Sequence, residues 1–209
     1  MKKKIVFIMN PISGTSSKAA VPSLIDSTLD KEQFEYEIKM TERPEHASEL
    51  AAEARDNHAD IVVAVGGDGT VNEVARSLVH SDSALGILPC GSGNGLARHL
   101  LLPMNLKKSI EIINACEIHD LDYGVINEYP FFCTCGMGFD AFVSMKFAES
   151  GKRGPISYAE NILREGLKYE PETYTLEDET GTKQYKAFLI SCANASQYGN
   201  NAILPHRHL

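Results

Sequence analysis

A run of five apolar residues that ends in a glycine-rich loop constrains the fold of this chain more than any other feature. Residues 61–65 (Ile-Val-Val-Ala-Val) are followed directly by Gly66-Gly67-Asp68-Gly69-Thr70. Five consecutive β-prone residues are typical of a strand buried on both faces, as in a parallel sheet. The glycines allow a sharp turn and a close approach to a ligand. Apolar residues at helical spacing follow in 71–79, so we expect a helix whose N-terminus presents free N–H groups to a phosphate.

One carboxylate, Asp68, lies in the middle of this loop. An acid beside a bound phosphate repels it unless the acid holds Mg²⁺ or accepts a proton, and this indicates phosphoryl transfer. The phosphate-loop signature G-x-x-x-x-G-K-[ST] does not occur in the chain. A phosphatase with an aspartyl nucleophile would need a second Asp where the chain has Gly66. A simple Asp-Gly turn is the alternative interpretation of the motif taken alone.

Composition argues against a nucleic-acid-binding, a membrane-spanning and an exported protein. The 209 residues include 28 acidic and 20 basic side chains, giving a net charge of −8, which argues against a nucleic-acid partner. No apolar run approaches the roughly 20 residues of a transmembrane helix, and the run after Lys2–Lys4 is too short for a signal peptide. We therefore expect a cytoplasmic protein. We expect neither disulfides nor a metal site from its five scattered cysteines, at positions 90, 116, 133, 135 and 192.

The order of predicted elements changes near residue 118. Before it, strands and helices alternate, which predicts an α/β domain over 1–117 with a parallel sheet. Its predicted strands are 5–9, 34–40, 61–65 and 85–89, and its main predicted helices are 18–29, 45–57, 71–79 and 107–115. After it, we expect a mainly β domain over 118–209, with strands at 120–126, 130–135, 173–176 and 184–192 and one helix at 155–169. Loops at the carboxyl ends of parallel strands converge on one crevice, so we expect the glycine-rich loops to meet there.

Five short motifs occur in order along the chain. They are Asn10-Pro11-x-Ser13-Gly14, Thr41 ahead of His46-Ala47, the run from Gly66 to Glu73, Pro89-x-Gly91-Ser92-Gly93-Asn94, and Gly136-x-Gly138-Phe139-Asp140. Together they resemble the catalytic domain of the diacylglycerol kinase family, which includes bacterial lipid kinases and the sphingosine and ceramide kinases. The resemblance covers essentially the whole chain. Gly-Gly-Asp-Gly-Thr alone would equally suggest the NAD kinases, which share the fold of the first domain.

The resemblance implies an α/β protein in which an NAD-kinase-like parallel α/β domain is followed by an incomplete β-sandwich domain. It implies ATP and Mg²⁺ as cofactors, with Asp68 as the catalytic residue near the metal and Asp140 at the lipid head group. For Ser13, Thr41, Ser92 and Asp140, helix capping is the alternative role. The residues that would bind ATP are Asn10, Pro11, Ser13, Gly14, Thr41, Gly66, Gly67, Asp68, Gly69, Thr70, Asn72, Glu73, Gly91, Ser92 and Asn94.

The last residues depart from the family pattern. Family members continue through strands that supply a structural Mg²⁺ site and through an Asp-Gly-Glu motif whose Glu is the general base, and neither has a counterpart before Leu209. We therefore expect a C-terminally truncated or degenerate kinase that transfers the γ-phosphoryl group of ATP to a lipid hydroxyl, such as that of diacylglycerol, at a membrane surface. Loss of the base would slow it by about 10²–10⁴-fold. The alternatives are a non-catalytic nucleotide-binding fragment and an NAD-kinase-like enzyme. The sequence leaves open which lipid is used, whether the chain forms homo-oligomers and whether it associates peripherally with the membrane.

Overall fold

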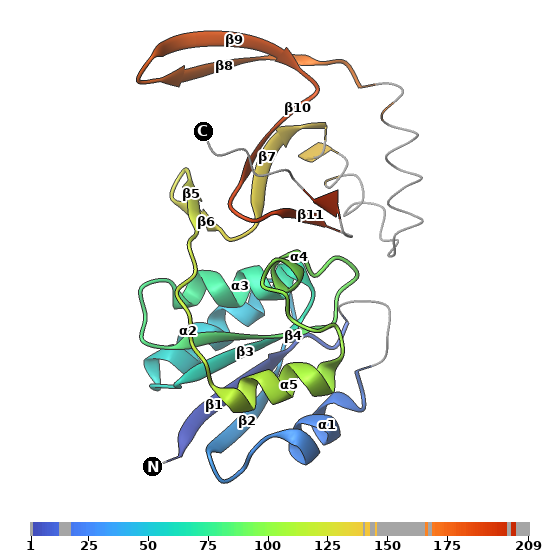
Figure 1. The fold of residues 1–209 in the computed structure, drawn as a ribbon, viewed down its shortest axis with the longest axis vertical. Helices are drawn as coiled ribbons and strands as arrows, with labels where there is room; N and C mark the ends of the chain where they lie inside the picture. Colours follow the sequence, from blue (N-terminus) through green and yellow to red (C-terminus); the bar gives the residue numbers. More distant parts are fainter. Residues whose placement is uncertain are drawn as a thin grey trace. The chain divides into compact units, whose positions relative to one another are not determined.

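The computed structural model describes residues 2–12, 18–139, 141–142, 145, 166, 169–199 and 202–203. The predicted site residues Ser13, Gly14 and Asp140 lie outside these residues, as does most of the helix predicted over 155–169. The chain divides into two compact units, one of Met1–Cys133 with Asn194–Leu209 and one of Thr134–Ala193 (Figure 1).

The first unit is built on a four-stranded parallel sheet with the order β2-β1-β3-β4. Its strands are β1 (Lys3–Met9), β2 (Phe34–Met40), β3 (Ile61–Gly66) and β4 (Ala84–Pro89). Ile5 of β1 pairs with Tyr36 on one side and with Ile61 on the other. The sheet therefore grows from β1 to β2 on one side and from β1 to β3 and β4 on the other. The direction in which strands are added reverses between β1 and β3. This is the switch point at which open α/β sheets form a ligand crevice.

Helices cover both faces of this sheet (Figure 1). On one face lie α2 (His46–Asp56) and α3 (Asp68–Leu78), packed on Val6 and Ile8 of β1; on the other lie α1 (Val21–Thr28) and α5 (Leu106–Ala115), packed on Ile5 and Phe7. Successive strand side chains point to opposite faces, so a strand between two helix layers must be apolar at every position. The continuous apolar runs at 5–9 and 61–65 satisfy this requirement, and the structure confirms the predicted α/β class.

Antiparallel strands make up most of the described part of the second unit. β7 (Thr134–Gly138) pairs with β10 (Leu189–Ala193), and β8 (Glu172–Asp178) forms a hairpin with β9 (Gly181–Ala187). The strand predicted over 184–192 is interrupted at Phe188, because the Phe188 carbonyl accepts a hydrogen bond from the Phe139 N–H and the chain changes partner there, from β8 to β7. The turn predicted at 178–181 is confirmed, with Asp178 accepting hydrogen bonds from the backbone and hydroxyl of Thr180.

Shorter elements complete the first unit. They are α4 (Gly95–His99), the hairpin of β5 (Gly124–Ile126) and β6 (Tyr129–Phe131), and the pair β11 (Gln197–Gly199) and β12 (Ala202–Ile203). The strand predicted over 130–135 is divided between β6 and β7. After β10 the chain is bonded again to the first unit, since the N–H groups of Asn194 and Ala195 both donate to the Cys133 carbonyl. Ala195 is fully buried there.

The register of β7 and β10 leads to the first prediction. Cys135 lies directly opposite Cys192, with the two thiols within hydrogen-bonding distance, and both are free. Paired strand positions have Cα atoms about 4.5–5.5 Å apart, which suits a disulfide. We expect mild oxidation with diamide to give an intramolecular Cys135–Cys192 disulfide, detected by peptide mass spectrometry and lost in Cys135→Ser. A slip of one residue would move Cys192 to the other face, so a disulfide between different cysteines would contradict this register.

Candidate functional site

The predicted site residues lie where the parallel strands end. Asn10 follows β1, Thr41 follows β2, Gly67 follows β3 and Gly91 follows β4, so all four lie at the carboxyl edge of one sheet (Figure 1). Backbone hydrogen bonds continue beyond the strands at this edge: Asn10 N–H donates to the Val65 carbonyl at 3.1 Å, and Thr41 N–H donates to the Met9 carbonyl at 2.9 Å. Residues distant in sequence are thereby fixed as neighbours around the switch point.

Asn10 connects the end of β1 to the first turn of α3. Its side-chain Oδ1 accepts a hydrogen bond from the Ile12 N–H at 3.1 Å, which makes a local turn, and its Nδ2 lies 3.3 Å from Thr70 Oγ1. Thr70 is buried directly against Gly66, where a Cβ would overlap the threonine hydroxyl. Pro11, next to Asn10, is exposed. The amide of Asn10 therefore shapes the edge of the sheet rather than pointing freely into solvent.

Lys18 is a buried cation at the same edge that the sequence analysis did not include among the site residues. It is 6% exposed, and its Nζ donates a hydrogen bond to the Asn10 carbonyl at 2.9 Å. Burial raises the pKa of the Cys90 thiol at the end of β4, and the positive charge of Lys18 offsets part of that rise. Lys18 was predicted to begin a helix, but α1 begins at Val21. The sequence feature that could have identified Lys18 as a site residue is its position in the turn between a glycine-containing motif and a helix.

The loops after β3 and β4 pack backbone against backbone. A Cβ on Gly91 would lie 2.5 Å from the Gly67 Cα, and a Cβ on Gly67 would lie 3.2 Å from the Gly91 Cα. Only glycine permits this approach. The loop predicted over 66–70 is shorter than expected: Gly67 is the N-cap of α3, and Asp68 is already its first residue.

Asp68 spans the two loops with its carboxylate. Oδ2 accepts a hydrogen bond from the Asn94 N–H at 2.9 Å, and Oδ1 accepts one from the Gly95 N–H at 2.6 Å. These are the first N–H groups of α4, so the acid caps this short helix and its charge complements the positive helix end. The residue itself is exposed. The structure thus gives Asp68 a structural role that the sequence analysis did not predict.

Asn94 holds the loop after β4 closed. Its backbone adopts the left-handed conformation (φ 52°), and its buried side-chain amide both accepts from the Gly91 N–H and donates to the Gly91 carbonyl, each at 2.8 Å. Arg98 donates from Nε to the Gly93 carbonyl at 2.9 Å. Ser92 lies exposed at the tip of this loop. The side chain of Asn94 therefore fixes the conformation that presents Ser92.

The remaining predicted residues lie on α3 or next to it. Glu73 Oε2 accepts a hydrogen bond from the Ala47 N–H at 3.1 Å, at the start of α2, while Gly69 and Asn72 are exposed. Cys133, which was not predicted as a site residue, lies near Asp68: burial, with a contribution from the Asp68 charge, raises the pKa of its thiol to about 11. This thiol is protonated at neutral pH and is therefore a poor nucleophile.

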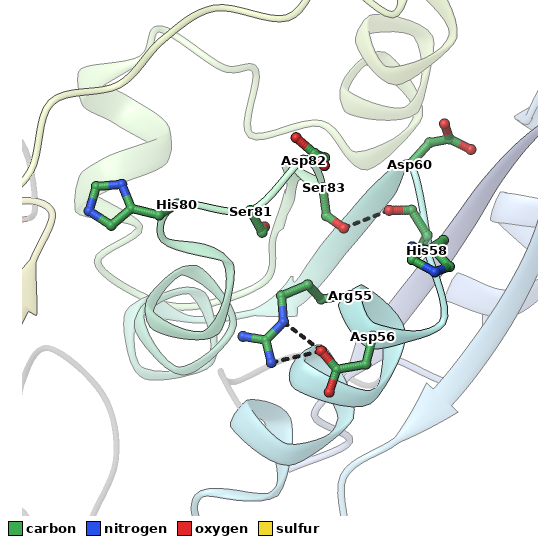
Figure 2. A pocket seen from close by; sticks show the side chains of 9 residues that line it. Arg55, Asp56, His58, Asp60, His80, Ser81, Asp82 and Ser83 are labelled. Carbon is green, nitrogen blue, oxygen red and sulfur yellow. Dashed lines mark hydrogen bonds and ion pairs between the residues drawn. The ribbon is translucent and has the colours of Figure 1, made fainter.

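A separate pocket of about 500 Å³ lies at the opposite, amino edge of the sheet (Figure 2). Some of its polar groups contact one another: Arg55 is paired with Asp56 at 2.8 Å, and Ser83 Oγ donates to the Ala59 carbonyl at 2.6 Å. It contains none of the predicted site residues, so the candidate site is at the carboxyl edge. The pocket is lined by Arg55, Asp56, His58, Ala59, Asp60, His80, Ser81, Asp82 and Ser83.

The contact between the two loops generates the second prediction. Gly91→Ala forces the backbones apart, because the new Cβ would overlap Gly67 and also lie 2.8 Å from Asn94 Oδ1. We expect it to destabilise the fold by about 1–3 kcal/mol. Gly69→Ala is the matched control, since nothing lies within 4 Å of its Cβ position and alanine favours helix. Thermal unfolding followed by circular dichroism measures both, and equal transition temperatures would contradict the close contact.

Comparison with known proteins agrees with this architecture. The model of the diacylglycerol kinase catalytic domain matches residues 4–126. A diacylglycerol kinase from Staphylococcus saprophyticus is 31% identical over 163 residues, covering 76% of this chain and 53% of that protein. The "Probable lipid kinase YegS" of Escherichia fergusonii is 29% identical over 178 residues, covering 82% of this chain and 60% of that protein.

The fold is also similar to that of a solved structure. A crystal structure of a diacylglycerol kinase from Bacillus anthracis superposes with a TM-score of 0.72 at 22% identity, covering 97% of this chain and 67% of that one. This chain therefore spans between half and two thirds of the length of these relatives. Within the described residues, no helix is long and apolar enough to cross a membrane. The match of the family model over more than half of the sequence places this chain in the diacylglycerol kinase catalytic-domain family.

Proposed function

We propose that the chain binds ATP at the carboxyl edge of its parallel sheet and serves as the nucleotide-binding part of a lipid kinase. The observation that carries this proposal is that three features lie at this edge of the sheet: the buried cation Lys18, which donates to the Asn10 carbonyl, the N-terminus of α3, and the glycine contact of Gly67 with Gly91. The first N–H groups of a helix have no partner within it, and together with the lysine charge they suit phosphate oxygens.

The predicted residues take two kinds of role in this proposal. Asn10, Glu73 and Asn94 maintain the shape of the loops through their hydrogen bonds to Thr70, Ala47 and Gly91. The exposed residues at the same edge, including Ser92 and Asn72, are available for direct contact with the nucleotide. Hydroxyl and backbone N–H donors on short loops are typical phosphate ligands.

The proposed Mg²⁺ fits one carboxylate at this edge. In nucleotide-dependent enzymes Mg²⁺ is commonly held by one or two carboxylates together with substrate phosphates and water. Asp68 is the acid in the first turn of α3, and each of its oxygens retains a lone pair after accepting a backbone N–H. Among the described residues, no group of three or more acidic, histidine or cysteine side chains forms a metal site. We infer that the metal would arrive with ATP and would neutralise charge on the phosphates.

The acceptor in this proposal is a lipid hydroxyl, such as that of diacylglycerol, with Asp140 at the lipid head group. Its support is membership of the family and the names of the two relatives. One observation favours the alternative that the chain binds nucleotide without transferring phosphate: each oxygen of Asp68 already accepts one backbone N–H in capping α4. A carboxylate held in this way is a weaker candidate for taking the proton of the attacking hydroxyl.

The third prediction tests the function itself. With radiolabelled ATP and Mg²⁺, we expect transfer of phosphate to diacylglycerol in mixed micelles, and we expect ADP binding by isothermal titration calorimetry. ADP binding without transfer to any lipid would favour the non-catalytic alternative. Transfer to NAD⁺ instead of lipid would favour an NAD-kinase-like enzyme. Failure to bind either ADP or ATP would refute the proposed site.

The fourth prediction concerns Lys18. Lys18→Met removes the positive charge at the carboxyl edge, and we expect ATP affinity to fall about 10- to 100-fold, the range for losing a charge-assisted hydrogen bond. The affinity for AMP should fall less, because we expect the Lys18 charge to act on the β- and γ-phosphates, which AMP lacks. Lys31→Met is the matched control, since that lysine is exposed and pairs with Asp26 at the surface. An equal loss for AMP and ATP would indicate a folding defect rather than phosphate recognition, as would a lowered unfolding temperature.

A further inference from the structure

The connection between α4 and α5 displays apolar side chains to solvent. Leu101 is 88% exposed, and its neighbours Leu100 and Met104 are 40% and 37% exposed. Single exposed apolar side chains are common on proteins, but three within five residues form a cluster. We call this segment, Leu100–Lys108, the α4–α5 loop; it ends in the first turn of α5.

The exposure of Leu101 is built into the backbone. Leu101 adopts a left-handed conformation (φ 57°), which is unfavourable for a residue with a Cβ and would be relaxed in glycine. Hydrogen bonds hold the loop on both sides of it: the Leu102 N–H donates to the Ala97 carbonyl at 2.8 Å, and the buried Ser109 hydroxyl donates to the Pro103 carbonyl at 2.7 Å. Leu102 itself packs against the core. A strained leucine on a fixed loop is displayed by the fold and is not a frayed end.

The charge around this loop is opposite to that of the whole chain. The net charge is −8, yet no acidic residue occurs in the sequence between Asp82 and Glu111. That interval contains Arg98, His99, Lys107 and Lys108, of which the two lysines are exposed. Among the described acids, Asp68 of α3 accepts a hydrogen bond from the first residue of α4, and Glu111 lies one turn along α5 from the lysines. The exposed side chains of the loop itself are therefore apolar at Leu100, Leu101 and Met104 and cationic at Lys107 and Lys108.

The α4–α5 loop is attached to the candidate site. Asn94 Nδ2, which holds the loop after β4, also lies 3.7 Å from the Met104 sulfur. A surface that contacts Met104 and Leu101 would thus lie beside the loop that carries Ser92.

We propose that the α4–α5 loop docks the protein on an anionic lipid bilayer. Leu101, with Leu100 and Met104, enters the boundary between head groups and acyl chains, and Lys107 and Lys108 contact the anionic head groups. Burial of apolar side chains combined with cationic contacts is how peripheral proteins bind such surfaces. Three side chains are too few for the apolar centre of a stable protein interface, which buries about 800 Å² on each partner. The proposal rests on the proposed function, since docking brings the nucleotide site to the surface that holds the lipid.

The experiment is cosedimentation of the full chain with vesicles, without nucleotide. We expect binding to vesicles of phosphatidylglycerol and phosphatidylcholine, and weaker binding to phosphatidylcholine alone. Leu101→Gly removes the side chain and relieves the left-handed strain, so we expect it to raise the unfolding temperature and to lower vesicle affinity about tenfold. Lys107→Gln with Lys108→Gln should abolish the preference for anionic vesicles. Ile118→Gly is the matched control, because this apolar residue, 61% exposed, lies beyond the far end of α5 and should not affect binding.

The outcomes separate this proposal from the proposed kinase activity. Absence of vesicle binding by the wild type, or equal binding by Leu101→Gly, would overturn docking. Light scattering that showed a dimer lost in Leu101→Gly would also overturn it, since a second copy would then cover the loop. If vesicle binding depends on Leu101 while no acceptor is phosphorylated, docking stands and the kinase proposal fails. If the kinase proposal holds, Leu101→Gly should phosphorylate a water-soluble short-chain diacylglycerol as well as the wild type does.

Discussion

The close approach of the backbones at Gly67 and Gly91 is the constraint on which the candidate site depends. It brings the loop after β3 against the loop after β4, at a separation that a side chain on Gly91 would not permit. Once the loops touch, the Asp68 carboxylate reaches the N–H groups of Asn94 and Gly95 and caps α4. The Asn94 amide then closes the second loop on Gly91. Two glycines and two side chains thus form one connected set of contacts.

The parallel sheet makes this set of contacts possible by aligning the ends of its strands. Because β1 lies between β2 and β3, Asn10 and Thr70 meet across the switch point although they are 60 residues apart in sequence. The two helix layers bury both faces of β1 and β3, so the strand ends have little freedom. Lys18 adds a positive charge to this edge, and the Asn10 carbonyl holds it in place. A rigid framework of this kind is what precise recognition of phosphate requires.

Most of the first unit could be predicted from the sequence, and the site in part. Continuous apolar runs identified β1 and β3, and alternation of apolar and charged residues identified β2. The motifs correctly located the strand ends that meet at one edge. Lys18 could not be identified, because its burial depends on neighbours from other segments. The capping role of Asp68 was missed for the same reason, since its partners lie 26 and 27 residues later in the chain. In the second part, the division of 184–192 at Phe188 depends on its pairing with Phe139 and was not visible in local patterns.

The sequence by itself determined the class of fold, the position of the glycine-rich turns and the family, because hydrophobic period and ordered motifs are local properties of the chain. Only the tertiary structure decided which polar groups maintain the loops and which remain exposed, since each hydrogen bond there joins residues from different segments. The exposure of Leu101 is also decided by the tertiary structure. Its sequence context of three leucines and a proline equally fits a buried helix end, and the left-handed backbone after α4 is what turns Leu102 into the core and Leu101 toward solvent.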